Sequence, residues 1–290
     1  MAHQPAAQTA FGPMVLAALE QYEAPRRRFV DDDLAFAFLP AGLRAVVSAS
    51  RLKPLRRLII GATERAGPGL WANLTCRKRF IDEVLDDALP DIDAVVILGA
   101  GLDTRPYRLA RRSDIPVYEI DLPVNVERKR AVVRRVLGAA PASVRLIPVD
   151  FERDDLAAEL ADAGHRPEDR TFFVWEGVTQ YLSADAVHAT FDYLQHAAPS
   201  SRLVFTYVRR DFIDGTNLYG ARSAYRRFRE KQQVWQFGLD TDEIAEFVAQ
   251  YGWRLVEQAG PDYFLHHYVK PSGRDLTASQ LEWTAYAEKR

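Results

Sequence analysis

The segment Ala94-Val-Val-Ile-Leu-Gly-Ala-Gly-Leu-Asp-Thr-Arg105 joins an apolar run to a glycine-rich turn and the start of a predicted helix. Gly99 and Gly101 carry no Cβ, so the backbone can turn sharply there and a ligand can approach it closely. Asp121 follows 20 residues after Gly101, at the end of the next apolar run. An acidic side chain in this place binds the two hydroxyls of a nucleotide ribose. Together these features predict a nucleotide-binding turn at the carboxyl edge of a parallel sheet.

Outward from this turn, short apolar runs alternate with segments of helical periodicity. Such an alternation predicts an α/β fold, in which helices cover both faces of a parallel sheet. The expected strands are residues 94–98, 115–120, 144–149, 171–175 and 203–208, and the helices between them are 104–112, 124–138, 154–163 and 183–198.

The C-terminal part adds a helix, expected at 241–251, and two more strand-like runs at 253–258 and 263–269. These two runs flank Ala259-Gly-Pro-Asp262, whose composition is typical of a turn. We therefore predict a seven-stranded sheet whose last two strands form an antiparallel hairpin. Such a hairpin is unusual in dinucleotide dehydrogenases and is expected in one group of transferases.

Composition divides the chain into further regions. Residues 13–90 show helical periodicity and predict a helical N-terminal cap, preceded by a disordered tail at 1–12. Residues 91–290 form the expected nucleotide-binding domain. Within it, the segment 209–239 is long for a connection and mixes aromatic side chains with arginines, which indicates an inserted lid. The alternative is an amphipathic helix packed on the body of the domain.

The overall composition excludes several classes of protein. The chain has 290 residues, a net charge of −2 and a single cysteine, Cys76. A disulfide framework and a cysteine-based zinc site are therefore excluded, and the charge carries no nucleic-acid signature. The uncharged N-terminus lacks the basic residues of a signal peptide, and no later apolar run approaches the roughly 18 residues of a membrane span. We expect a soluble, cytoplasmic protein.

Residues 25–79 depart from this charge balance, with 12 Lys or Arg residues against four acidic ones. One interpretation is a solvated helical face. The other is a surface that attracts anionic substrates or, as a remote alternative, RNA.

The residues after Gly101 indicate which nucleotide binds. The dinucleotide fingerprint requires a third glycine, but Thr104 occupies its position. Asp103, at the expected helix start, suits the helix dipole but would repel a pyrophosphate in a partly desolvated site. S-adenosylmethionine has no phosphate and carries cationic sulfonium and ammonium groups. The turn therefore favours S-adenosylmethionine as the cofactor, with an NAD-dependent oxidoreductase as the remote alternative.

Two further strand ends carry acidic side chains. Asp150 and Phe151 follow the third strand, where the carboxylate can accept a hydrogen bond from the adenine amine while the ring packs on the base. Glu176 follows the fourth strand. Because ligands bind outside the carboxyl ends of parallel strands, we expect these side chains to meet Gly99 and Asp121 in one crevice.

Five motifs stand in order along roughly residues 70–290. They are Leu98-Gly-Ala-Gly-Leu-Asp-Thr-Arg-Pro-Tyr-Arg-Leu109, Tyr118-Glu-Ile-Asp-Leu-Pro123, Val149-Asp-Phe151, Trp175-Glu-Gly-Val-Thr-Gln-Tyr-Leu182 and Tyr268-Val-Lys-Pro-Ser-Gly-Arg274. This set resembles the leucine carboxyl methyltransferase family, and within it the bacterial S-adenosylmethionine-dependent branch that includes polyketide carboxyl O-methyltransferases. The resemblance implies a class I methyltransferase fold with a Rossmann-like sheet. The lid and the first 70 residues have no counterpart in it, and these parts would select the acceptor.

The resemblance also implies roles for individual residues. Arg77 would pair with the methionine carboxylate, with Arg79 as the alternative in register, and Glu176 would lie near the ammonium group. Tyr181 would face the acceptor. The other expected cofactor contacts are Gly99, Ala100 and Gly101 at the turn, Asp121 and Leu122 at the ribose, and Asp150 and Phe151 at the adenine. Acceptor positioning is assigned, by place in the sequence only, to Arg209, with Arg210 and Arg222 as alternatives.

The nature of the acceptor decides whether the enzyme needs a base. A carboxylate, with a pKa of about 4, is ionised at neutral pH, whereas a phenol, with a pKa of about 10, needs a base or a metal. His188 and His196 on a predicted helix, and His266 and His267 side by side on a predicted strand, offer no clear base. We therefore predict a carboxyl O-methyltransferase without a metal, acting on a small molecule or peptide of secondary metabolism. Methylation of a phenol or another hydroxyl is the alternative.

Overall fold

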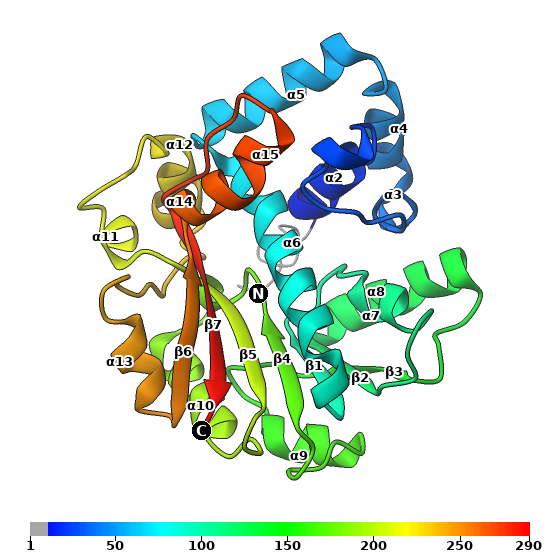
Figure 1. Cartoon of the computed structure of the whole chain (residues 1–290), viewed down its shortest axis with the longest axis vertical. Coiled ribbons are helices and arrows are strands. Elements are labelled where there is room, and N and C mark those ends of the chain that lie inside the picture. The colour runs from blue at the N-terminus through cyan, green and yellow to red at the C-terminus, as the bar shows by residue number, and fades with distance from the viewer. Residues whose placement is uncertain (1–10) are drawn as a thin grey trace.

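The computed structural model describes residues 11–290, and residues 1–10 lie outside the described part. The predicted tail at 1–12 falls largely on those ten residues, and its last two, Phe11 and Gly12, already belong to helix α2 (Phe11–Glu20). Within the described part, seven strands form one mixed sheet in the order β3-β2-β1-β4-β5-β7-β6 (Figure 1).

Five parallel strands, β1 to β5, form the main part of this sheet. β1 (Ala94–Leu98) and β4 (Thr171–Trp175) have the predicted bounds and are buried along their whole length, because helices cover both faces. β2 (Val117–Asp121) begins only after Pro116, whose nitrogen has no hydrogen to donate to a ladder. The other strands are β3 (Val144–Pro148), β5 (Arg202–Val208), β6 (Trp253–Ala259) and β7 (Glu282–Lys289).

Alternate side chains of the central strands point into two apolar cores. Val95 and Ile97 pack in the core shared with the N-terminal cap, whereas Val96 and Leu98 pack in the core under the helices on the opposite face. The helices after the cap that flank the sheet are α7 (Arg105–Leu109), α8 (Pro123–Leu137), α9 (Leu156–Asp162), α10 (Ala184–Leu194) and α13 (Ile244–Ala249). This two-sided burial confirms the predicted α/β class.

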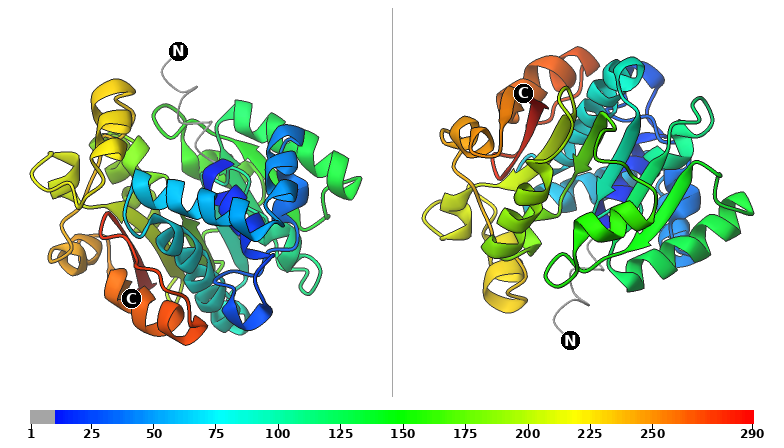
Figure 2. Two further views of the ribbon diagram at one scale, coloured as in Figure 1. Left: turned by 90° about the horizontal axis from the view of Figure 1, so that it is seen from above. Right: turned by 90° about the horizontal axis from the view of Figure 1, so that it is seen from below.

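The N-terminal cap consists of helices gathered at one end of the molecule, foremost when it is seen from above and behind the strands when it is seen from below (Figure 2). Its helices after α2 are η1 (Pro25–Arg27), α3 (Ala35–Phe38), α4 (Ala41–Ala49), α5 (Lys53–Ala66) and α6 (Leu70–Ala88), followed by the short η2 (Leu89–Asp91). The long α6 leads from the cap onto the sheet, where Ile81 and Leu85 join the core that contains Val95. Among residues 11–290, no helix combines the length and hydrophobicity needed to cross a bilayer.

The buried carboxylate of Glu20 fastens the cap to the C-terminal part of the chain. It accepts hydrogen bonds from the indole nitrogen of Trp71 at 2.7 Å and from the backbone nitrogen of Phe29 at 2.9 Å. The guanidinium of Arg274 pairs with it at 2.7 Å. A single buried charge therefore joins α2, α6 and the segment before β7.

The C-terminal strands differ from the prediction. β6 and β7 are antiparallel as expected, but residues 263–269 are helical and β7 is formed by residues 282–289. Pro261 begins α14 (Pro261–Phe264), which continues into the π-helix η5 (Leu265–Val269) and α15 (Lys270–Ser272). Proline is common at the first position of a helix, so the Gly-Pro pair starts a helix here instead of turning a hairpin. His266 and His267 consequently lie exposed on a helix and not on a strand.

The segment 209–239 leaves and rejoins the sheet at one place. Arg209 and Leu239 form a parallel bridge, and the backbone nitrogen of Arg210 donates to the carbonyl of Leu239 at 3.1 Å. Between them lie α11 (Arg210–Ile213), α12 (Arg222–Tyr225) and the π-helix η4 (Arg226–Lys231), at the left of Figure 1. Phe212, Ile213 and Ala221 form a small apolar core of their own with Val208 and Leu281, apart from the two main cores. The two ends of the segment 209–239 therefore lie side by side, and part of the segment packs apart from the main cores.

Candidate functional site

A cavity of about 920 Å³ lies beside the carboxyl ends of β1, β2 and β4. Small-molecule sites occupy roughly 300–1,000 Å³, so the cavity has room for a large ligand or for two smaller ones. Its wall contains every residue predicted to bind the cofactor and the predicted acceptor residue Tyr181: Arg77, Gly99, Ala100, Gly101, Asp121, Leu122, Asp150, Phe151, Glu176 and Tyr181.

The nucleotide-binding turn follows β1 and is held by the carboxylate of Asp121. Gly99 has a φ of +71° and Gly101 a φ of +46°, in the left-handed region that glycine adopts without strain. The backbone nitrogen of Gly101 donates to Oδ2 of Asp121 at 2.6 Å. Oδ1 of Asp121 accepts from the backbone nitrogen of Leu122 and from Nδ2 of Asn125, both at 2.7 Å. Asn125, which the sequence analysis missed, therefore fixes the orientation of this carboxylate.

Burial raises the pKa of Asp121 above the ordinary value, although the hydrogen bonds from Asn125 and the backbone nitrogens of Gly101 and Leu122 act in the opposite direction. Lys129 on α8 supports the turn from beneath. It is buried, forms an ion pair with the buried Glu119 and donates to the carbonyl of Ala100 at 3.3 Å. The ion pair of Lys129 and Glu119 therefore supports the turn from the interior of the protein.

At the carboxyl end of β4, on the same edge of the sheet as the turn, the carboxylate of Glu176 lies among cations. Nε of Arg77 binds Oε1 of Glu176 at 2.8 Å, and Nζ of Lys78 lies 3.7 Å from the same oxygen. Arg77 also pairs with Glu282 on β7, which the sequence analysis missed because it assigned the last strand elsewhere. Burial opposes the ionisation of Glu176, but Lys78, Arg105 and Arg77 outweigh it and hold its pKa below the ordinary value. Glu176 therefore stays negative at any physiological pH.

Arg105, the first residue of α7, connects this cluster to the nucleotide-binding turn. Its side chain is only 3% exposed, and its Nη1 lies 2.6 Å from both Glu176 and Asp103. It also pairs with Asp82 of α6, and its Nη2 donates to the carbonyl of Lys78 at 3.1 Å. Burial works against the charged guanidinium, but Asp103, Glu176 and Asp82 more than compensate and raise its pKa above the ordinary value. One arginine thus pairs with two buried carboxylates, Asp103 and Glu176, and with the partly exposed Asp82.

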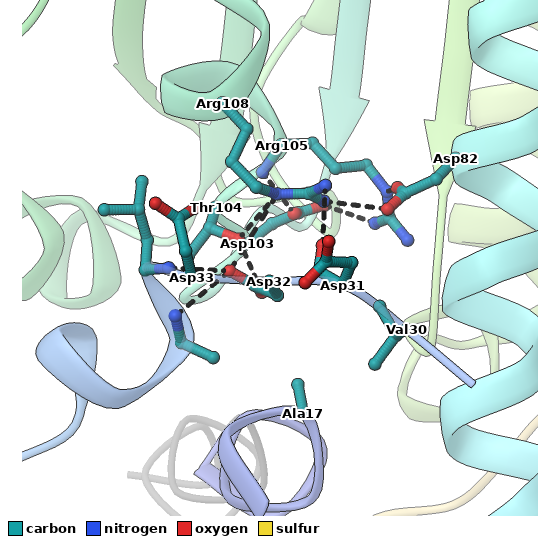
Figure 3. A network of polar contacts seen from close by, with 12 residues as sticks. Ala17, Val30, Asp31, Asp32, Asp33, Asp82, Asp103, Thr104, Arg105 and Arg108 are labelled. Carbon is teal, nitrogen blue, oxygen red and sulfur yellow. Dashed lines mark hydrogen bonds and ion pairs between the residues drawn. The ribbon is translucent and has the colours of Figure 1, made fainter. Parts of the chain in front are cut away.

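The segment 31–33 of the cap lies beside this network and contacts Thr104 and Arg108 (Figure 3). Arg108 binds Asp82 at 2.9 Å, and the hydroxyl of Thr104 donates to Oδ2 of Asp32 at 2.7 Å. Oδ1 of Asp32 accepts from the backbone nitrogen of Ala35 at 3.0 Å, at the start of α3. The cap is therefore coupled directly to the residues that shape the turn.

The surroundings of Asp103 weaken one argument made from the sequence. Its Oδ1 accepts from the backbone nitrogen of Arg105 at 2.9 Å, as expected for an acid at a helix start. Burial disfavours its charge, but Arg105 and Lys78 lower its pKa overall. Because Arg105 balances this carboxylate at 2.6 Å, Asp103 alone would repel a pyrophosphate less than expected.

One side of the cavity is formed by residues of the segment 209–239 and by Tyr181, which was predicted to face the acceptor. The rings of Tyr181 and Trp235 meet edge to face at 6.3 Å, and Trp235 stacks on Phe228 at 4.6 Å. The backbone nitrogen of Gln236 donates to the carbonyl of Gln180 at 2.7 Å, which fastens this segment to the residues after β4. The segment 209–239 therefore contributes an aromatic wall.

The predicted acceptor residue Arg209 is not brought to this cavity. Its guanidinium binds Asp211 at 3.2 Å and lies over the ring of Tyr219. The alternatives Arg210 and Arg222 do not line the cavity either, and Arg79 is engaged with Glu83 at 2.7 Å. Arg227 of η4 is the arginine of the segment 209–239 that lines it, and among the described residues it has no carboxylate partner. The position of Arg227 could not be predicted from a segment with six arginines in which the sequence did not delimit the helices.

Histidines are absent from the wall of the cavity as far as residues 11–290 are concerned. His188 binds the hydroxyl of Tyr251 at 2.6 Å, and His165 binds the hydroxyl of Thr171 at 2.8 Å, at the amino end of β4. In the same described range, no group of three His, Cys, Asp or Glu side chains is arranged to hold a metal ion.

Comparison with known proteins identifies relatives that cover most of the chain. Residues 10–195 match the family described as leucine carboxyl methyltransferase. A protein of Mycobacterium bovis named "Putative S-adenosyl-L-methionine-dependent methyltransferase" is 32% identical over 242 residues, which cover 79% of this chain and 77% of the relative. One of the same name from Mycobacterium sp. (strain KMS) is 34% identical over 232 residues, covering 75% and 74%.

The fold is shared with a solved structure from Thermobifida fusca whose title reads "putative methyltransferase". It has a TM-score of 0.60 at 18% identity and covers 96% of this chain and 94% of its own. The sheet order and the antiparallel last strand agree with the class I methyltransferase fold that the motifs implied. Since the family match spans more than half of the chain and the mycobacterial relatives exceed 30% identity, the chain belongs to the leucine carboxyl methyltransferase family.

Proposed function

We propose that the protein is an S-adenosylmethionine-dependent carboxyl O-methyltransferase that converts a carboxylate of a small molecule or peptide into its methyl ester. Family membership and the names of the mycobacterial relatives support the methyl donor. The acceptor is inferred from the chemistry of the cavity.

The charge of the cavity wall fits S-adenosylmethionine. Six carboxylates line the cavity but only three cationic side chains do: Asp103, Asp121, Asp150, Glu152, Glu176 and Glu282 against Arg77, Lys78 and Arg227. This excess of negative charge favours a cofactor with sulfonium and ammonium groups over one with a pyrophosphate. In the proposed assignment, Asp121 holds the ribose hydroxyls, Asp150 and Phe151 hold the adenine, and Arg77 with Glu176 holds the methionine end.

The acceptor side fits an apolar molecule that carries a carboxylate. Trp235, Phe228 and Tyr181 provide an aromatic wall for its body, and Arg227 provides a cation for its carboxylate. When bound, S-adenosylmethionine supplies a methyl group on an activated sulfonium. The protein has to align the acceptor oxygen with that group and exclude water, and it has no proton to remove from a carboxylate. The single observation that carries the carboxylate is Arg227, a cavity-lining cation without a carboxylate partner, on a wall without a described histidine.

Replacing Arg227 with methionine tests the acceptor assignment. We expect KM for the carboxylic acid substrate to rise about tenfold or more, since a charged hydrogen bond is lost, whereas the affinity for S-adenosylhomocysteine stays unchanged. The measurement is transfer of a labelled methyl group to a panel of apolar carboxylic acids and matching phenols. Arg226→Met is the matched control, because Arg226 is the preceding residue, pairs with Glu230 at 3.9 Å and does not line the cavity. Transfer to phenols alone, or equal KM values for both variants, would contradict the assignment.

The raised pKa of Asp121 predicts how cofactor binding depends on pH. The ribose hydroxyls donate to the ionised carboxylate, so affinity is present above the pKa of Asp121 and is lost as the pH falls through it. Because burial raises this pKa, the loss should begin at a higher pH than the ordinary value of about 3.9 implies. Glu176 has a lowered pKa and stays ionised throughout this window.

Calorimetric titration with S-adenosylhomocysteine from neutral pH down to the ordinary carboxyl pKa of about 3.9 measures this dependence, because a raised pKa places the decline within that range. We expect Asp121→Asn to bind more weakly at neutral pH and to lack the decline seen in the wild-type chain. A wild-type affinity that is constant over the same range, or a decline that persists in Asp121→Asn, would refute the assignment of Asp121.

A further inference from the structure

The side chain of Asn73 is an exception among the buried polar groups of α6. It lies one helical turn before Arg77, lines the cavity and is 1% exposed. Neither its Nδ2 nor its Oδ1 has a hydrogen-bond partner among the described residues. Because both amide atoms are unpaired, exchanging the nitrogen and the oxygen would not satisfy the group.

An unpaired buried amide destabilises a fold, and the rest of the helix avoids this cost. The hydroxyl of Thr75, also buried, donates to the carbonyl of Trp71 at 2.8 Å. Leu70 and Leu74, on either side of Asn73, line the same cavity with apolar side chains. A leucine at position 73 would therefore suit the free protein better, and the amide is best explained as a group that a ligand pairs.

The hydrogen-bonding capacity of this amide indicates which part of a ligand it meets. An amide offers a donor and an acceptor side by side, which matches an α-amino acid group with its carboxylate and ammonium. The carboxylate of the methyl-accepting substrate can only accept hydrogen bonds. It would therefore pair with Nδ2 of Asn73 and leave Oδ1 unpaired. The nearby cations are shared with protein carboxylates, since Arg77 binds Glu176 through Nε and Glu282 through Nη1, and Lys78 lies 3.7 Å from Glu176. The methionine carboxylate therefore needs a further donor.

We infer that Asn73 recognises the α-amino acid end of the cofactor, donating to its carboxylate through Nδ2 and accepting from its ammonium through Oδ1. This inference rests on the proposed function, because it requires S-adenosylmethionine in the cavity. Asn73 would then make the protein discriminate between complete cofactors and analogues that lack the amino acid.

Calorimetry with two ligands on the full chain tests the inference. S-adenosylhomocysteine carries the amino acid, and 5′-methylthioadenosine lacks it. We expect Asn73→Leu to weaken binding of S-adenosylhomocysteine about 10- to 100-fold and to leave 5′-methylthioadenosine unchanged. Thr75→Val is the matched control, since it removes a buried polar group of the same helix that does not line the cavity, and it should alter neither affinity.

Thermal unfolding of the ligand-free chain provides a second measurement. If the amide is unpaired in the free protein, Asn73→Leu should raise the unfolding temperature by a few degrees while it weakens binding. Unchanged affinity of Asn73→Leu for S-adenosylhomocysteine, or an equal loss for both ligands, overturns the role of Asn73 and leaves the proposed function standing. Failure of the wild-type chain to bind either ligand overturns the proposed function and this inference with it.

Discussion

Replacement of Arg105 by methionine is expected to lower the free energy of unfolding by about 3–5 kcal/mol, because it leaves buried carboxylates without their counter-ion. Arg105 is 3% exposed and pairs with Asp82, Asp103 and Glu176 at once. Methionine keeps much of the volume of the side chain, so the cost is one of uncompensated charge and not of a cavity. Denaturant unfolding, followed by two spectroscopic probes, measures it.

The matched control is Arg111→Met. Arg111 lies on the same side of the molecule and pairs with Asp33 at 2.7 Å, but the two side chains are 49% and 61% exposed. Exposed pairs contribute about 0–1 kcal/mol, so this variant should remain close to wild type. If Arg105→Met were no less stable than Arg111→Met, the network of Figure 3 would not contribute to the stability of the fold.

The central strands were predictable because burial on both faces leaves a distinct pattern. β1 and β4 are continuous apolar runs that end at the glycine-rich turn and at Glu176, and both have the predicted bounds. The prediction of a strand at 263–269 was wrong, because a short aromatic segment has no periodicity that distinguishes a strand from a helix. In the structure Tyr263 and His267, four residues apart, stack at 4.0 Å, as neighbours on a helix do.

The cofactor side of the site was also accessible from the sequence, for a topological reason. Parallel strands deliver their carboxyl ends to one edge, so Asp121, Asp150 and Glu176 could be grouped without knowing any distance. Glu282 could not, since it binds Arg77 across 205 residues and lies on the strand that the pattern misplaced. Arg105 belongs to the glycine-rich motif at 98–109, but its pairing with Glu176 could not be predicted, because the two residues are 71 positions apart in the sequence.

Gly99→Ala is expected to have the largest effect on cofactor binding of any single methyl group added to the chain. At a φ of +71°, any other residue costs about 1–2 kcal/mol, and the added Cβ would overlap the side chain of Val178. The turn must shift to relieve this overlap, which adds about 1–3 kcal/mol and displaces the backbone that we propose contacts the nucleotide. A displacement of about 1 Å at such a site can cost about 100-fold, so we expect a loss of that order in affinity for S-adenosylhomocysteine.

Gly138→Ala separates the two causes. Gly138 has a φ of +82°, but an added Cβ there meets no atom within 4 Å, so this variant has the backbone strain without the overlap. It should lose about 1–2 kcal/mol of stability and no affinity. The double variant Gly99→Ala/Val178→Ala removes the overlapping methyl groups, and its affinity should recover in part while the strain remains. Equal affinities for Gly99→Ala and Gly138→Ala would mean that the close approach of the turn to Val178 does not control binding. A loss of affinity that is confined to Gly99→Ala and is relieved by Val178→Ala would show that cofactor binding depends on the position of the backbone at this turn, a contribution that no side chain can replace.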